Sequence, residues 1–165
     1  MTPRFRPAPA AADRDDGTDL ALKLWVVLAR SFRAVEAHAE ADIARHDLTL
    51  AEFGVLEALH HKGPLLLGDL QRRILVSSGG VTWLVNRLVK RGLVERRPCD
   101  GDKRARYAAL TSRGEAFVKR IFPEHAEAIR VAVGGLGESE QRIAITLLRR
   151  LGMGAAARAG DGGER

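Results

Sequence analysis

The sequence has a single cysteine, Cys99, among 165 residues, so no disulfide can form within the chain. A chain without internal disulfides is typical of a reducing compartment. The longest apolar runs, at 24–29 and 65–67, are far shorter than the roughly 20 residues that span a bilayer. The basic first residues are not followed by an apolar segment, so we expect no secretory signal. We therefore predict a cytoplasmic location and no membrane partner.

The sequence also lacks the motifs of common enzymes. It contains no G-x-S-x-G, no phosphate-binding P-loop and no G-x-G-x-x-G. Its five histidines form neither H-E-x-x-H nor a Cys/His pair at the spacing of metal ligands. We predict no catalytic activity, no cofactor and no metal site.

Positive charge is concentrated in the middle of the chain. Residues 61–115 carry 12 Lys and Arg against 5 Asp and Glu, whereas the remaining residues carry 15 against 16. The formal net charge of +6 therefore comes from a third of the chain. Clustered positive charge on one part of a fold is typical of proteins that bind a phosphate backbone, so we expect a nucleic-acid partner.

Apolar residues at three- and four-residue spacing predict a long first helix over 19–44. A second helix begins at Thr49, because Thr49 and Glu52 form a T-x-x-E capping box. It ends at Gly63-Pro64.

The next segments predict a short strand, two helices and a strand hairpin, in that order: residues 65–67, 68–75, 81–91, 93–98 and 104–110. This order is that of a winged helix-turn-helix. The second of the two helices is amphipathic, and Gly92 ends it where a left-handed residue is needed.

Two further helices follow the hairpin. Thr111 caps the first, and Pro123 inside it is expected to kink or restart it. Gly134-Gly135 ends that helix, and the last helix begins at 137–140. The expected fold is mostly α with a small β-hairpin wing (α+β).

The resulting division has helical regions on both sides of the winged part. We expect residues 18–48 and 112–152 to form a helical dimerisation region around a winged helix-turn-helix at 49–111. The two ends, 1–17 and 153–165, have few core residues, and we expect them to be disordered.

In combination these features resemble the MarR family of bacterial transcriptional regulators. Four segments carry the resemblance: the helix-turn-helix at 68–92, Gly-Leu-Val-Glu-Arg at 92–96, Asp-Gly-Asp-Lys-Arg at 100–104 and Leu-Thr-x-x-Gly at 110–114. The match runs in order from about residue 20 to residue 151. Each segment alone is a weak signal, but their order and spacing are specific.

The resemblance implies a homodimer whose first and last helices interlock, and two lobes that read a palindromic operator in double-stranded DNA. It also implies a small phenolic, quinone or anionic ligand between the dimerisation and DNA-binding regions. The segments 76–80 and 96–99 are similar to an MhqR-like subgroup, which includes repressors that respond to hydroquinones and catechols. The chain is thus expected to be a ligand-responsive repressor associated with the nucleoid.

A recognition helix needs small polar residues at its start, so that its backbone can approach the DNA. The candidate contacts from this helix and the turn before it are Ser77, Ser78, Gly79, Gly80, Thr82, Trp83, Asn86, Arg87 and Lys90. Hydroxyls of Ser and Thr reach phosphates or base edges, and an Asn can pair with adenine. For the two cations, we expect phosphate contacts. The competing interpretation is a plain turn followed by a solvated helix face.

The hairpin supplies a second group of candidate contacts: Arg97, Asp102, Lys103, Arg104 and Arg106. An arginine at a wing tip can enter the minor groove, where narrow A·T tracts deepen the negative potential. The resemblance assigns this role to Arg104, with Asp102 orienting it. The competing interpretation is a charged hairpin that protects an edge strand from aggregation.

Two weaker hypotheses concern regulation. Trp25, Phe32, His38, Phe53 and His60 can line an effector cavity, although their spacing fits core packing equally well. Cys99 lies near cations that would lower its thiol pKa and favour reaction with quinones or peroxide. An unreactive surface cysteine is the competing interpretation.

Three rival functions remain open from the sequence. The chain can be an effector-independent architectural DNA-binding protein, or a winged helix that binds another protein. An enzyme is the third, and no set of nucleophile, base or metal ligands supports it.

Overall fold

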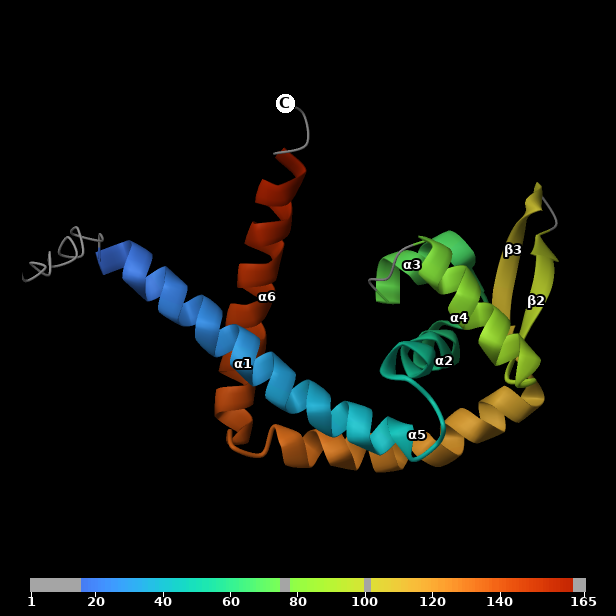
Figure 1. The fold of residues 1–165 in the computed structure, drawn as a ribbon, viewed down its shortest axis with the longest axis horizontal. Helices are drawn as coiled ribbons and strands as arrows, with labels where there is room; N and C mark the ends of the chain where they lie inside the picture. The colour runs from blue at the N-terminus through green and yellow to red at the C-terminus, as the bar shows by residue number, and fades with distance from the viewer. Residues whose placement is uncertain (1–15, 75–77, 100–101, 162–165) are drawn as a thin grey trace, which may run out of the picture.

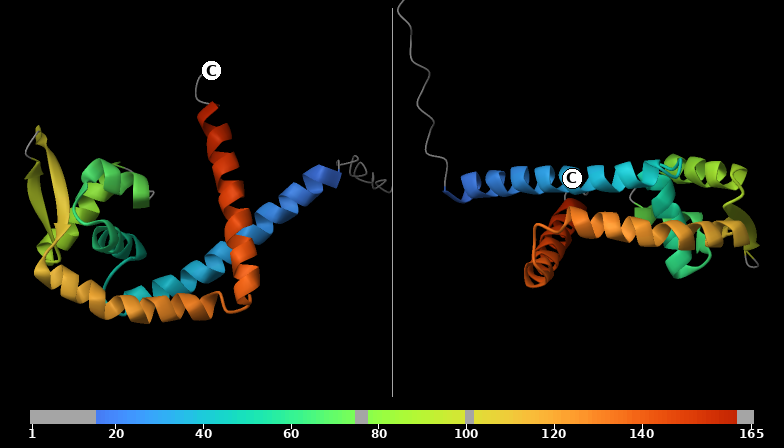
Figure 2. Two further views of the ribbon diagram at one scale, coloured as in Figure 1. Left: turned by 180° about the vertical axis from the view of Figure 1, so that it is seen from behind. Right: turned by 90° about the horizontal axis from the view of Figure 1, so that it is seen from below.

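The computed structural model of the chain describes residues 16–74, 78–99 and 102–161; at 16, 78, 79, 99, 102–105, 160 and 161 it describes the backbone alone. Two long helices, α1 (Asp16–Ala44) and α5 (Ser112–Ala132), pack against each other (Figures 1 and 2). After α5 the chain turns into α6 (Glu138–Asp161), which points away from both and packs closely on no other described element (Figure 2).

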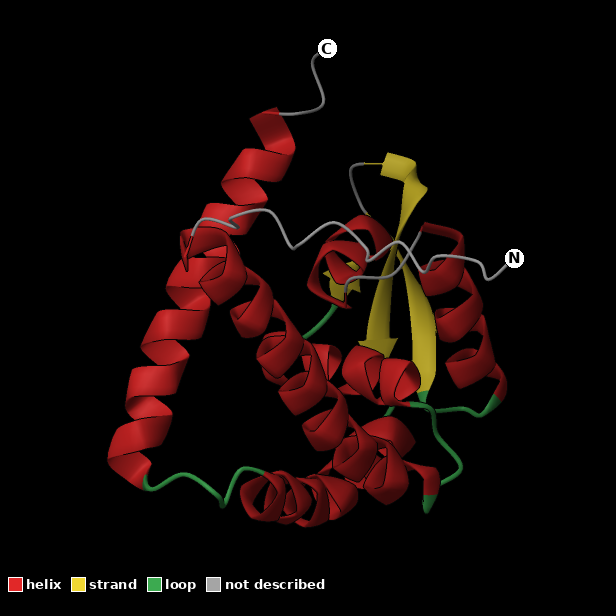
Figure 3. Cartoon of the chain, turned by 60° about the vertical axis from the view of Figure 1, so that its left-hand side comes forward, coloured by secondary structure: helices red, strands yellow, loops and turns green. Residues whose placement is uncertain are grey.

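The residues between α1 and α5 form a separate small lobe (Figure 1). Its elements in chain order are α2 (Leu50–Lys62), β1 (Leu65–Leu66), α3 (Leu67–Ile74), α4 (Ser78–Lys90), β2 (Val94–Cys99) and β3 (Asp102–Leu110). The strands make an antiparallel sheet in the order β1-β3-β2, which stands beside the helices of the lobe (Figure 3). The expected fold class, mostly helical with a small hairpin wing, is confirmed.

Local signals in the sequence explain where these helices begin and end. Thr49 Oγ1 accepts from the Glu52 amide at 3.2 Å, and the Glu52 carboxylate accepts from the Thr49 amide at 2.9 Å, which confirms the capping box. Thr111 caps α5 by accepting from Gly114 N at 3.0 Å. Gly63 and Gly92 end α2 and α4 with φ values of 74° and 69°, where a side chain would be strained.

The core of the lobe lies between α2, α3, α4 and the sheet. The α4 residues at i, i+3, i+4 and i+7 are all buried, as their spacing predicts: Val81, Leu84, Val85 and Leu88. They join Phe53, Leu56 and Leu70 from the two preceding helices in one cluster. This packing fixes the side of α4 that faces the protein and leaves the opposite side exposed.

One expectation from the sequence is answered in part, and another is wrong. Helix α5 runs through Pro123 as one helix, so it does not restart there, and the expected kink stays a prediction. Pro123 removes a hydrogen bond to the carbonyl of Lys119, but both residues are exposed, so water can satisfy that carbonyl. The wrong expectation is a disordered segment from 153, because α6 continues to Asp161. Alanines at 155–157 and 159 are strong helix formers and outweigh the nearby glycines.

Smaller differences concern element boundaries. The first helix begins at Asp16, slightly before the expected start. Strand β3 begins at Asp102 instead of Arg104, because Asp102 pairs with Cys99 across the hairpin. Among the described residues, no helix is both long enough and apolar enough to cross a membrane.

Candidate nucleic-acid interface

Helix α4 carries most of the residues predicted to contact DNA. Thr82, Trp83, Asn86 and Lys90 are all exposed, and Gly80 is half-buried. The backbone of Ser78 and Gly79 forms the first turn of α4, whereas Ser77 lies outside the described residues. The start of α4, the end of β2 and the start of β3 lie at the end of the lobe farthest from α5 (Figure 1). A duplex approaching this end would meet both elements.

A groove of about 470 Å³ separates α3 and the start of α4 from the sheet. It is lined by Leu66, Leu67, Gly68, Asp69, Arg72, Thr82, Arg96 and Arg106. The structure therefore brings Thr82 and Arg106, both predicted from the sequence, to one place. It adds two arginines that were not predicted from the sequence, Arg72 and Arg96.

The register of the hairpin explains why Arg96 and Arg106 share this groove. Arg96 pairs with Ala108, and Pro98 pairs with Arg106, so the two arginines point to the same face of the sheet. That face is the one on which Val94 and Ala108 are buried. Alternation from Val94 would have identified Arg96, but only once the core face of the strand was known. Arg72 is ion-paired with Asp69 within α3, and no local motif marked it.

Arg97 lies on the opposite face of the hairpin. Its guanidinium donates to Glu95 Oε1 at 2.7 Å, so its charge is partly balanced within β2. The backbone of Asp102, Lys103 and Arg104 forms the start of β3, and their side chains lie outside the described residues. The same holds for the side chain of Cys99, so its reactivity stays a prediction.

Arg87 occupies a different environment from Lys90, the other cation of α4. Its Nε lies 3.0 Å from Glu52 Oε1, and the Glu52 side chain is fully buried. The N–H groups of Arg87 are not aligned with that oxygen as a hydrogen bond requires, so the contact is an ion pair. The guanidinium also lies over the ring of Trp83, 4.8 Å from its centroid.

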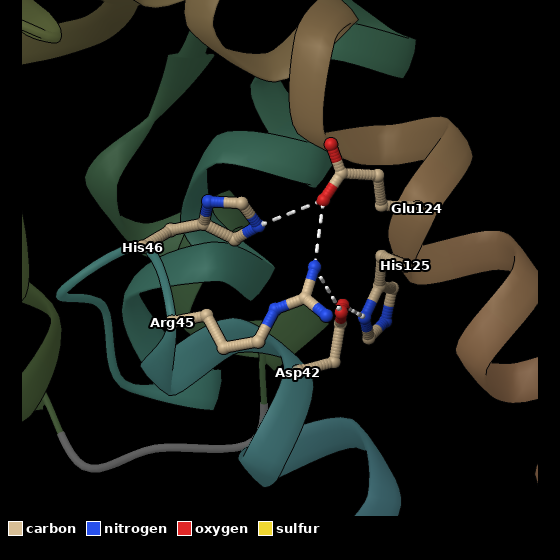
Figure 4. A network of polar contacts seen from close by, with 5 residues as sticks. All are labelled: Asp42, Arg45, His46, Glu124 and His125. Atoms are coloured by element: carbon tan, nitrogen blue, oxygen red, sulfur yellow. Dashed lines mark hydrogen bonds and ion pairs between the residues drawn. The ribbon is translucent and has the colours of Figure 1, made fainter.

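Polar contacts join the long helices where the lobe begins (Figure 4). Buried His125 on α5 has Nδ1 3.1 Å from Asp42 Oδ2 on α1. Arg45 donates to Glu124 at 2.7 Å, and His46 Nε2 lies 3.7 Å from the same Glu124 oxygen. These contacts tie the end of α1 and the loop after it to α5.

Shifted pKa values among the described residues occur on the exposed surface of α5. A hydrogen bond from Lys119 lowers the pKa of Glu115. A hydrogen bond from Arg130 lowers the pKa of Glu127, and this contact in turn raises the pKa of Arg130. These are solvent-screened pairs within one helix, and they do not mark a reactive site.

The five residues proposed for an effector cavity are not gathered in one place. Trp25 and Phe32 are 65% and 62% exposed on α1, whereas Phe53 is buried in the core beside His125. His60 lies near Phe122, and His38 lines a shallow hollow between α1 and α5.

A larger cleft, about 670 Å³ in volume, opens between α1, α2 and α3. It has a mixed lining of acidic and basic groups that includes Glu36, Glu40, Glu57, His61 and Arg73. Its volume lies within the range of small-molecule sites. None of the effector candidates predicted from the sequence lines this cleft.

An exposed helix beside a basic groove and an antiparallel hairpin defines the chain as a winged helix-turn-helix protein. A sequence model described as MarR family matches residues 46–105. The chain is 36% identical to the HTH-type transcriptional regulator MhqR of Bacillus subtilis over 138 residues, which cover 84% of this chain and 95% of that protein. The chain belongs to the MarR family, as its motifs predicted.

Solved structures agree with this assignment. BpsR of Bordetella bronchiseptica is 27% identical to the chain, with a TM-score of 0.72. The DNA binding of BpsR is regulated by 6-hydroxynicotinic acid. The match covers 79% of this chain and 98% of BpsR. Sco3205 of Streptomyces coelicolor, a MarR family regulator solved in complex with DNA, is 25% identical with a TM-score of 0.76. That match covers 81% of this chain and 90% of Sco3205.

Proposed function

We propose that the chain is a homodimeric transcriptional regulator that binds a palindromic operator and represses the genes beside it. The observation that carries this proposal is the placement of the exposed face of α4 next to a groove holding Arg72, Arg96 and Arg106. A helix in the major groove and cations along the adjacent backbone are the two parts of sequence-specific binding. The structure of Sco3205 in complex with DNA supports DNA binding by a chain of this fold.

The contacts divide by chemistry. Ser77, Ser78, Gly79 and Gly80 bring the backbone of the α4 start close to the DNA. Base edges are read by Thr82, Trp83 and Asn86, and the phosphates are met by Lys90, Arg97, Lys103 and Arg106. Arg104 enters the minor groove, oriented by Asp102.

The experiment is a binding titration on a duplex that the wild-type protein selects from a random-sequence library. If about 6 to 10 phosphates are neutralised per dimer, affinity should fall by about 10³ to 10⁵ between 50 and 200 mM salt. If the chain is instead a winged helix that binds another protein, no DNA sequence will be enriched, and any residual DNA binding will lack this dependence on salt. That outcome would remove the proposed function.

A small aromatic ligand is proposed as the signal that releases the DNA. Two observations support it: the DNA binding of BpsR is regulated by 6-hydroxynicotinic acid, and this chain has a cleft between α1, α2 and α3. Thermal-shift measurements with phenolic acids, quinones and hydroxynicotinic acids test this, since a bound ligand raises the unfolding temperature by mass action. If no compound both raises that temperature and weakens operator binding, the architectural alternative is favoured.

The protein is proposed to act in the bacterial cytoplasm, associated with the nucleoid. It needs neither a catalytic group nor a cofactor for this role, because binding and release of DNA suffice. The relatives that match it are named as transcriptional regulators.

A further inference from the structure

We infer that Arg87 is a positioning residue, which with buried Glu52 sets the orientation of the recognition helix and does not itself contact DNA. The sequence predicted a phosphate contact for Arg87, because it is a cation on an amphipathic helix. The inference rests on the proposed function, since it concerns how α4 is presented to a duplex.

Glu52 needs a cation where it lies. Its side chain is 0% exposed. One carboxylate oxygen accepts from the amide and the hydroxyl of Thr49, at 2.9 and 3.0 Å. The other oxygen has Arg87 Nε at 3.0 Å. A buried carboxylate is costly without a paired cation, so moving Arg87 out to a phosphate would leave an uncompensated charge inside the lobe.

Arg87 also lies on the flank of α4 that faces α2. At about 100° per residue, it is roughly 60° from Lys90 around the helix, toward α2. Arg91 follows Arg87 by four residues and therefore lies on the same flank. Arg91 also reaches back into the protein, donating to the carbonyls of Asp47 and His46 at 2.5 and 3.3 Å. Arg87 in the last turn of α4 and Arg91 directly after it thus hold onto α2 and the loop before it.

The Arg87 guanidinium has a second contact within α4. Trp83 lies one turn earlier on the helix, and its ring centroid is 4.8 Å from the guanidinium carbon. Such a cation–π contact adds to the charge pair in restraining the side chain. Although the Arg87 side chain is 42% exposed, its charged end is held by an anion and by an aromatic face.

These contacts connect α4 to the long helices. Glu52 and Thr49 belong to the start of α2, and the loop before them carries the carbonyls that Arg91 binds. The same loop follows Arg45, which is paired with Glu124 on α5 (Figure 4). The polar contacts of Arg87, Arg91 and Arg45, together with apolar packing, therefore set the angle of α4 relative to the long helices.

The test is a double-mutant cycle with Glu52→Gln, Arg87→Gln and the double variant, using the duplex selected by the wild-type chain. A glutamine at 52 can still complete the capping box, so the start of α2 is preserved. Affinity is measured as a function of salt concentration. Thermal unfolding curves first confirm that each variant is folded, and light scattering confirms that it is a dimer. Lys90→Gln is the matched control, because Lys90 lies on the exposed side of the same helix.

We expect E52Q and R87Q each to weaken DNA binding roughly tenfold. The double variant should bind the duplex at least as tightly as the single variant with the lower affinity. The slope of log affinity against log salt stays at the wild-type value for all three. K90Q instead lowers that slope by roughly 1 to 2 per dimer, as expected when one phosphate contact is lost from each subunit.

Two results would overturn the inference. If Arg87 contacts a phosphate, R87Q lowers the salt slope as K90Q does. In that case E52Q binds DNA as tightly as the wild type or more tightly, because a competing anion is gone. Should R87Q fail to fold, E52Q and the double variant decide the question alone. Failure of the wild-type protein to select any duplex would instead remove the proposed function.

Discussion

Gly114 lies where no side chain fits. A Cβ built on it would be 1.9 Å from the carbonyl oxygen of Leu93, and backbone cannot move aside as a flexible side chain can. We predict that Gly114→Ala lowers the free energy of unfolding by about 3 kcal/mol, the upper end of overpacking costs. Urea unfolding followed by circular dichroism measures this.

Gly68→Ala is the control for that prediction. Gly68 lies in α3, and a Cβ there meets nothing within 4 Å. An alanine should leave stability unchanged or raise it by up to about 1 kcal/mol, because alanine favours the helix. Equal effects of the two substitutions would show that the close approach of α5 to Leu93 is not what requires glycine at 114.

At the scale of single residues, the sequence predicted the caps and the exposed face of α4 but not the partners of its cations. Thr49 and Glu52 lie within four residues of each other, so their capping box can be recognised from the sequence. Arg87 and Glu52 are 35 positions apart, and only the packing of α4 on α2 brings them together. Arg72 and Arg96 meet at the groove for the same reason.

At the scale of elements, the role of the β2–β3 wing in DNA binding can be tested with one substitution. We predict that Arg104→Ala weakens operator binding roughly tenfold or more, because one arginine is lost from each minor groove. The loss should be larger for duplexes with A·T tracts under the wing, where the groove is narrow. Competition between A·T-rich and G·C-rich flanks measures it.

Arg130→Ala is the matched control for the wing. It removes the same charge from an exposed site on α5, where Arg130 is paired with Glu127. Binding should stay within about twofold of the wild type, because exposed pairs contribute little. If both variants lose affinity equally, overall charge explains the effect and the wing has no specific role.

Helix and strand boundaries were predictable where a local signal exists. Gly63, Gly92 and Thr111 all mark boundaries that the structure confirms. Pro123 does not restart α5, because a proline in a helix is tolerated where water reaches the freed carbonyl. The end of α6 lies beyond the expected one, because a scarcity of core residues does not prevent an alanine-rich segment from being helical.

At the scale of the whole molecule, α1 and α6 expose apolar side chains that a lone protomer would keep in water. Leu24 on α1 is 52% exposed, and Leu148 on α6 is 50% exposed. Large exposed apolar surfaces mark protein interfaces, and both helices lie in the region expected to form the dimer. We predict that Leu148→Glu yields monomers, with a mass by light scattering near 18.0 kDa instead of twice that value.

Lys23→Glu is the control for dimerisation, because it also introduces a glutamate, at an exposed polar position of α1. It should remain dimeric and bind DNA. Leu148→Glu should lose operator binding together with the dimer, since one lobe makes only half of the contacts. A dimeric Leu148→Glu protein would place the interface elsewhere.

In the proposed complex, two copies of the lobe, held by one dimer, bind two half-sites on the same side of a duplex. The most direct measurement compares the selected palindrome with the same duplex carrying about 5 additional base pairs, half a helical turn, between its half-sites. We expect affinity to fall toward the non-specific range, on the order of 10³-fold weaker, because the second half-site turns away from its lobe. Unchanged affinity for the lengthened duplex would show that the two lobes do not bind the two half-sites together.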